Sequence, residues 1–152
     1  MLARLFPRIA DNRYPGRRLG LWLFALMPLK LAMGLNVVLN APSVARSADG
    51  VPVDTFSHGG ASAFLFAFAA WGLCQFVLGL LSLVVLIRYR CLAPLVFLLL
   101  LVEQLGRMAL RWYWPVERVA APGAAINLAL AGIMLVGFLF SLWPPKASST
   151  GA

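Results

Sequence analysis

Charged side chains interrupt stretches of this sequence that are otherwise apolar enough to cross a membrane. Glu103, Arg107 and Arg111 follow the run LLLLV at four-residue intervals, so on a helix they form one stripe. Lys30 lies inside another apolar stretch. A charge at the centre of a membrane helix costs about 2.5–3.5 kcal/mol, so we expect these groups to pair with one another. Ionisable residues at that depth are by default candidates for a ligand-binding or proton-handling site.

Three of the polar residues share one predicted depth. Lys30, Gln75 and Glu103 lie about equally far along their own apolar stretches, near the middle of the hydrocarbon layer. We therefore predict an ion pair between Lys30 and Glu103, with Gln75 or Gln104 adding hydrogen bonds. General acid-base chemistry by Glu103 is one use of such a pair, because burial and pairing tune both groups.

Further polar side chains lie between this level and one end of the spans. This pattern predicts a polar crevice rather than an isolated ion pair. Its positive groups outnumber its negative ones, so it suits an anionic or amphipathic small molecule. The alternative is that these residues only hold the helices together, since interhelical hydrogen bonds contribute about 0.6 kcal/mol each in lipid. The predicted ligand-binding or polar-core residues are Lys30, Asn36, Gln75, Glu103, Gln104, Arg107, Arg111 and Asn127.

The elements that must position these residues are membrane helices. Hydrophobic residues make up 62% of the 152-residue chain, well above the roughly 45–50% of soluble domains. Four apolar stretches have the length of about 20 residues that a crossing requires. We predict one all-α domain, an integral membrane four-helix bundle. It comprises a basic interfacial segment 1–18, spans at about 19–39, 61–87, 92–111 and 123–143, and an extracytoplasmic loop 40–60.

Basic residues outside the spans gather on one predicted side of the membrane. That side holds Arg4, Arg8, Arg13, Arg17, Arg18, Arg88, Arg90 and Lys146, and the other side holds Arg46 and Arg118. By the positive-inside rule both termini are cytoplasmic, and we expect a multi-pass protein of the bacterial inner membrane. The net charge is +8, but the basic residues flank apolar spans instead of forming a stripe on a polar element. Nucleic acid is therefore not an expected partner.

Short motifs predict local features of the chain. Spacing of Leu2, Leu5, Phe6 and Ile9 predicts a short interfacial helix, with a basic tail as the alternative. The segment 88–91, Arg-Tyr-Arg-Cys, leaves little room between the second and third spans, which predicts a tight antiparallel hairpin.

Several spans also carry residues that shape a helix or its packing. Pro28 is expected to kink the first span just before Lys30, and Gly34, Gly72 and Gly79 are expected to let helices approach closely.

Motifs for cofactor chemistry are not found. The sequence has no HExxH, GxSxG or P-loop motif, and its one histidine, His58, cannot form a histidine pair for haem or a di-iron centre. Cys74 and Cys91 lie too far apart along the predicted elements to form a disulfide. We therefore predict neither a cofactor nor a metal site.

Three segments carry a resemblance to a known family. They are ALMPLKLAMGLNVVLNAP in the first span, FAAWGLCQFVLGLLSLVVLIRYR in the second, and LAPLVFLLLLVEQLGRMAL in the third, which includes Glu103. Together they resemble the DoxX-like small four-helix bacterial membrane proteins. The resemblance implies a four-helix fold and an inner-membrane location more than an activity, although some members are associated with redox or thiosulfate-linked complexes.

Three functions remain open on the sequence. The first is an inner-membrane protein whose mid-bilayer crevice binds a small or lipid-like molecule, for which an anionic group is favoured. The second is a non-catalytic accessory subunit of a larger membrane complex, and the third is a small acid-base enzyme that acts on a lipid through Glu103. Under each of these functions the chain contacts membrane lipid, and its partners include a second copy of itself or a larger membrane complex.

Overall fold

The computed structural model describes residues 2–144, and every regular element within them is helical. The bounds are α1 Leu2–Leu5, α2 Arg18–Phe24, α3 Leu29–Leu39, α4 Ala41–Ser47, α5 His58–Arg88, α6 Ala93–Tyr113 and α7 Gly123–Leu142, with 3₁₀ turns η1 Val53–Thr55 and η2 Arg90–Leu92. Four helical stretches are long and apolar enough to cross a membrane: Arg18–Leu39, His58–Arg88, Arg90–Tyr113 and Gly123–Leu142. They lie where the sequence predicts the spans, and the fold is compatible with a helical bundle.

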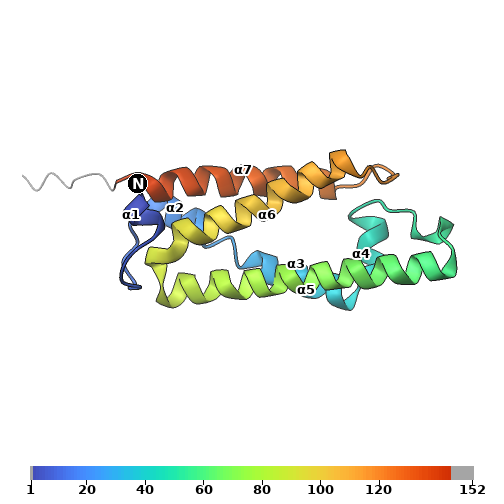
Figure 1. Ribbon diagram of the computed structural model, residues 1–152, viewed down its shortest axis with the longest axis horizontal. Coiled ribbons are helices and arrows are strands. Elements are labelled where there is room, and N and C mark those ends of the chain that lie inside the picture. Colours follow the sequence, from blue (N-terminus) through green and yellow to red (C-terminus); the bar gives the residue numbers. More distant parts are fainter. Residues whose placement is uncertain (1, 145–152) are drawn as a thin grey trace, which may run out of the picture.

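The helices run roughly along one axis in an elongated molecule (Figure 1). Residues 2–18, the α5–α6 turn and the end of α7 lie together at one end, which we call the basic end. The segments 40–57 and 114–122 lie at the opposite end, which we call the loop end. Most helix packing occurs between α3 and α5, between α6 and α7, and between α2 and α7.

The first span is broken, as Pro28 predicts. Pro28 has no backbone N–H to donate to the preceding turn. From Leu26 onward the amides donate three residues back, as in Met27 N–H to the Phe24 carbonyl (2.9 Å) and Lys30 N–H to the Met27 carbonyl (3.0 Å). The break separates α2, which packs on α7, from α3, which packs on α5, and Lys30 lies directly after it.

Glycines explain why α3 and α5 lie so close together. A Cβ added at Gly34 would lie 2.4 Å from the Phe76 nitrogen, and one at Gly79 would lie 2.2 Å from the Leu31 nitrogen. Gly72 likewise faces Val37. The sequence prediction of close approach at these positions is confirmed, and the backbones touch because no side chain separates them.

The second and third spans do not form the tightly packed hairpin predicted from the short turn. The turn itself is short, with Tyr89 and η2 joining α5 to α6. Beyond it α6 diverges from α5 toward α7 (Figure 1). The short turn fixes only the distance between the end of α5 and the start of α6. The rest of α6 packs mainly on α7.

Two apolar cores lie at different levels of the bundle. The larger core, toward the basic end, joins α2, α5, α6 and α7 and includes Phe24, Met27, Phe97, Leu100 and Met134. The smaller core lies under the loop end and comprises Ala45, Val51 and Val53 with aromatic side chains of α5 and the preceding loop. The charged residues of the spans lie between these two cores.

The loop predicted at 40–60 has more structure than expected. It contains α4, which packs on α5, and Ser57 caps α5 by accepting from the Gly60 amide (3.2 Å). Backbone hydrogen bonds tie it to the third loop, from Val119 N–H to the Gly50 carbonyl and from Gly123 N–H to the Ala48 carbonyl, both 2.9 Å. The two loops therefore form one cover over the loop end.

The basic N-terminal segment also differs from its prediction. Its helix ends at Leu5, and Phe6 and Ile9 are exposed, so no extended interfacial helix forms. The segment instead bonds to the bundle through Arg4 Nη1 to the Leu142 carbonyl (2.8 Å) and Arg17 N–H to the Phe140 carbonyl (3.0 Å). Lys146, which belongs to the predicted basic side, lies outside the described residues.

We expect Gly34→Ala to lower the free energy of unfolding by about 1–3 kcal/mol, because its methyl group overpacks the α3–α5 contact. Unfolding by titration with dodecyl sulfate in mixed micelles measures this change. Gly132→Ala is the matched control, since no atom lies within 4 Å of its Cβ position and alanine favours helix by up to about 1 kcal/mol. Equal loss of stability in both variants would contradict the packing account.

Candidate functional site

Glu103 is the centre of the buried charges. Lys30 Nζ donates to its Oε2 at 2.9 Å, and Arg107 Nε donates to its Oε1 at 2.6 Å. The Lys30 side chain is 3% exposed, while those of Glu103 and Arg107 are 23% and 22% exposed. The ion pair predicted between the first and third spans is therefore present, but one carboxylate serves two cations, which leaves one excess positive charge.

Hydrogen bonds extend the charged centre across to α7. Arg107 also donates to Gln104 Oε1 and, at 3.3 Å, to Asn127 Oδ1. Gln104 Nε2 donates to Asn127 Oδ1 (3.0 Å) and to its carbonyl (2.9 Å), and Asn127 Nδ2 donates to the Gly123 carbonyl (2.8 Å). We call Lys30, Glu103, Gln104, Arg107 and Asn127 the polar network. It links α3 to α6 and α7, whose backbones are not closely packed on α3.

Arg107 also contacts an aromatic ring of α5. Its guanidinium carbon lies 4.7 Å from the centroid of the Trp71 ring, within the range of a cation–π interaction. The contact joins α5 to the polar network, so side chains of all four spans meet at this level. The Trp71 ring stabilises the Arg107 guanidinium on the side of α5, where the helix carries no carboxylate.

A cavity of about 140 Å³ lies beside the polar network. Lys30, Arg107 and Asn127 line it together with Asn36 and Gln75. Asp49 and the end of α4 also line it, so the cover at the loop end closes it from that side. Pockets for drug-sized ligands occupy about 300–1,000 Å³, so this cavity fits a small anion or the acidic group of a larger molecule.

Two buried polar atoms at this cavity have no hydrogen-bond partner among the described residues. They are Gln75 Oε1 and Trp71 Nε1, and both residues line the cavity. Gln75 is 5% exposed. A buried polar atom without a partner costs about 1–3 kcal/mol, so the arrangement gains free energy from a polar guest that reaches these atoms.

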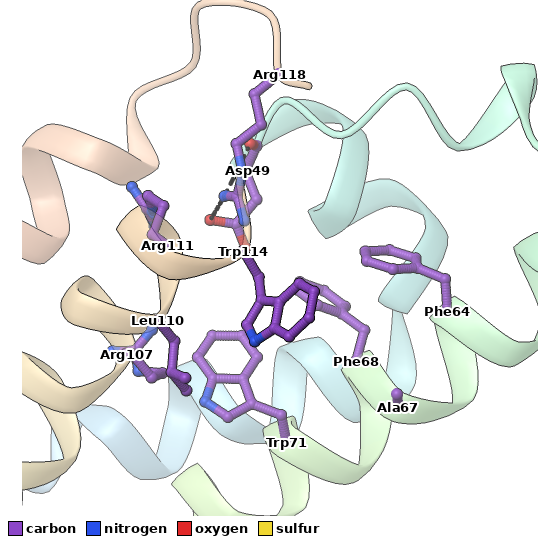
Figure 2. Close-up of a pocket in the computed structure, with 10 residues that line it drawn as sticks. All are labelled: Asp49, Phe64, Ala67, Phe68, Trp71, Arg107, Leu110, Arg111, Trp114 and Arg118. Carbon is purple, nitrogen blue, oxygen red and sulfur yellow. Dashed lines mark hydrogen bonds and ion pairs between the residues drawn. The ribbon is translucent and has the colours of Figure 1, made fainter. Parts of the chain in front are cut away.

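A second space, a groove of about 410 Å³, opens between α5 and α6 (Figure 2). Phe64, Phe68 and Trp71 of α5 form its apolar side. Its other residues bring three guanidinium groups, those of Arg107, Arg111 and Arg118, against one carboxylate, that of Asp49. The groove shares Trp71, Arg107 and Asp49 with the cavity, so these side chains separate the two spaces.

Arg118 closes one end of the groove. Its Nη1 lies 3.7 Å from Asp49 Oδ1, and the pair joins the first loop to the third (Figure 2). Burial lowers the pKa of Arg118 below its usual value, and the nearby positive charge of Arg111 lowers it further, while Asp49 opposes both effects. The side chain of Arg111 has no hydrogen bond or ion pair with any other part of the chain that the structure describes.

The predicted site residues divide between these features. Lys30, Glu103, Gln104, Arg107 and Asn127 come together in the polar network. Gln75 lines the cavity without the predicted hydrogen bond, and Asn36 lines it while accepting from Asn40 Nδ2 (2.9 Å). Arg111 lines the groove and lies apart from the network, although it continues the stripe of Glu103 and Arg107.

Sequence reasoning missed two parts of the site. Trp71 is not among the predicted site residues, and neither are Asp49 and Arg118. The Asp49 side chain is only 14% exposed, and it pairs with Arg118. Asp49 lies opposite an arginine of another loop only in the folded chain, so no sequence pattern indicates this pair.

The described residues hold no group of three or more metal-ligating side chains. Both cysteines are free, with Cys74 exposed and Cys91 buried. Comparisons with protein-family models, with curated proteins and with solved structures find no match to this chain. Any function proposed for the site therefore has to be argued from the residues of this chain alone.

Removing the shared carboxylate is expected to cost more than removing one of its cations. Glu103→Gln leaves Lys30 and Arg107 without a counter-charge, and an uncompensated buried charge costs about 3–5 kcal/mol. Lys30→Met leaves the pair of Glu103 and Arg107 intact, so we expect less than half that loss. Unfolding titration in mixed micelles compares the two variants. If Lys30→Met is as destabilising as Glu103→Gln, the carboxylate is not shared.

Proposed function

We propose that this protein is a multi-pass protein of the bacterial inner membrane whose cavity binds an anionic small or lipid-like molecule. The observation that carries the proposal is the buried Lys30 ammonium beside a cavity with two unpartnered polar atoms. An acidic group fits the excess positive charge, and the rest of the ligand fits Gln75 Oε1 and Trp71 Nε1 as hydrogen-bond partners.

Charge balance supports an anion over a cation or a neutral guest. The polar network contains two cations and one carboxylate, and the other carboxylate at the cavity, that of Asp49, is paired with Arg118. In a low-dielectric layer an excess charge is costly, and an anion that neutralises it recovers part of that cost. An anionic guest therefore gains most from the cavity.

Binding is favoured over acid-base catalysis by the hydrogen bonds of Glu103. Each of its carboxylate oxygens accepts from a cation, Oε2 from Lys30 and Oε1 from Arg107. A general base must take up a proton during the reaction, and protonation of Glu103 would remove the counter-charge of both cations. Glu103 in this state serves better to hold two cations in place than to accept a proton from a substrate.

The membrane assignment rests on the four apolar helical stretches and on the distribution of charge. Most of the arginines outside the spans lie at the basic end, which we place in the cytoplasm together with both termini. The loop end and the cavity cover then face the extracytoplasmic side. The resemblance to DoxX-like proteins agrees with this location.

The proposal predicts that protein purified from its own membranes carries about one anionic molecule per chain. Native mass spectrometry, followed by identification of the released molecules, measures this content. Gln75→Leu and Lys30→Met should each lose the bound molecule, because one removes a polar group of the cavity and the other removes the excess charge.

Ser82→Ala is the matched control on α5. Ser82 is buried and polar like Gln75, but its hydroxyl bonds to the carbonyl of Leu78 (2.8 Å) and does not line the cavity. It should keep the wild-type content. An unchanged content in folded Gln75→Leu and Lys30→Met protein would show that no anion binds in the cavity.

A further inference from the structure

The groove between α5 and α6 has the features of a second binding site, separate from the cavity. It exists because α6 diverges from α5 beyond their common turn and packs on α7 instead. The side chains that border it lie on two of the apolar helical stretches and on the cover at the loop end. Its opening therefore faces the surroundings of the helices at the level where they leave the hydrocarbon layer.

The two sides of the groove differ in chemistry. Phe64, Phe68 and Trp71 of α5 form a continuous aromatic surface, with ring centroids 5.7 Å and then 5.3 Å apart. Across from them, the α6 side and the loops bring Arg111 and Arg118 toward the loop end (Figure 2). An occupant must therefore be apolar along one part of its length and anionic at the end near the loops.

Arg111 and Arg118 face the same space, and their positive charges repel each other. Asp49 compensates Arg118, while Arg111 has no ion-pair partner within residues 2–144. An acidic group placed between them would neutralise Arg111 and relieve the repulsion. This charge complementarity selects an anionic occupant over a zwitterionic one.

The dimensions of the groove select a lipid over a small soluble anion. Its lining extends from Trp71 and Arg107 to Phe64 and Trp114, about 10 Å along each helix at a rise of 1.5 Å per residue. Its volume of about 410 Å³ is that of a ligand pocket. A free anion would leave the aromatic side uncovered, whereas an acyl chain would cover it.

We propose that this groove holds one anionic lipid, with its acidic headgroup between Arg111 and Arg118 and an acyl chain along Phe64, Phe68 and Trp71. The lipid occupies the extracytoplasmic half of the membrane in the orientation proposed above. Arg107 and Trp71 form the wall between this lipid and the cavity. Trp71 borders both spaces, but Lys30 and Gln75 line only the cavity, so variants at these two residues distinguish the lipid from the cavity ligand.

The probe is phosphatidylglycerol, with phosphatidylcholine as the zwitterionic comparison, added to the full chain in a neutral detergent. Native mass spectrometry gives the ratio of lipid-bound to free protein. Arg111→Gln should weaken phosphatidylglycerol binding about fivefold, since one basic residue contributes about 1 kcal/mol to an anionic headgroup, and should leave phosphatidylcholine binding unchanged. Arg46→Gln is the control, because Arg46 is an exposed arginine at the same end but outside the groove.

Ala67→Phe tests the apolar side without changing a charge. Ala67 lines the groove, so a phenyl ring there should displace the acyl chain and weaken the binding of both lipids. Ala70→Phe is the control, since Ala70 is also exposed on α5 but does not line the groove. Circular dichroism checks that all four variants keep their helical content.

Three results would overturn the proposal. The first is equal binding of phosphatidylglycerol by Arg111→Gln and Arg46→Gln. The second is displacement of the lipid by inorganic phosphate, which would identify a site for a free anion. The third is loss of the lipid in Gln75→Leu but not in Arg111→Gln, which would place it in the cavity and leave the proposed cavity function standing.

Discussion

The structure depends on one carboxylate, Glu103, which two cations share between the long apolar helices. Lys30 reaches it from α3, and Arg107 approaches it from the next turn of α6. These contacts connect helix pairs that pack closely within themselves, α3 on α5 and α6 on α7, but only weakly across the pair boundary. Side chains of the polar network therefore bridge a gap that backbones do not fill, and the cavity lies in that gap.

Local features of the chain place the network at this level. The break at Pro28 turns the first span from α7 toward α5, and Lys30 lies in the first turn of α3. Apolar cores lie toward the basic end and under the loop end. The backbone bonds between the first and third loops close the loop end above the cavity. The apolar residues on both sides confine the charged side chains of the network to this one level.

Much of this arrangement could be predicted from the sequence, for identifiable reasons. The spans follow from local hydrophobicity, and the break follows from the missing N–H of Pro28. The partner of Lys30 could be found because Glu103 alone among the five acidic residues lies within an apolar stretch. The contact of Arg107 with Trp71, the pair of Asp49 with Arg118, and the divergence of α6 from α5 depend on which helices pack together. Hydrophobic periodicity does not encode that choice in a helix that is apolar on every side.

Exchange of the two charges tests the central ion pair most directly. Lys30→Glu, Glu103→Lys and the double variant are compared by the fraction of folded protein recovered in mild detergent and by the free energy of unfolding. The account predicts that each single reversal is severely harmful, because it places like charges together in a buried site, and that the double variant recovers part of the loss. If Lys30→Glu is as harmful alone as it is together with Glu103→Lys, the two charges do not pair across the helices.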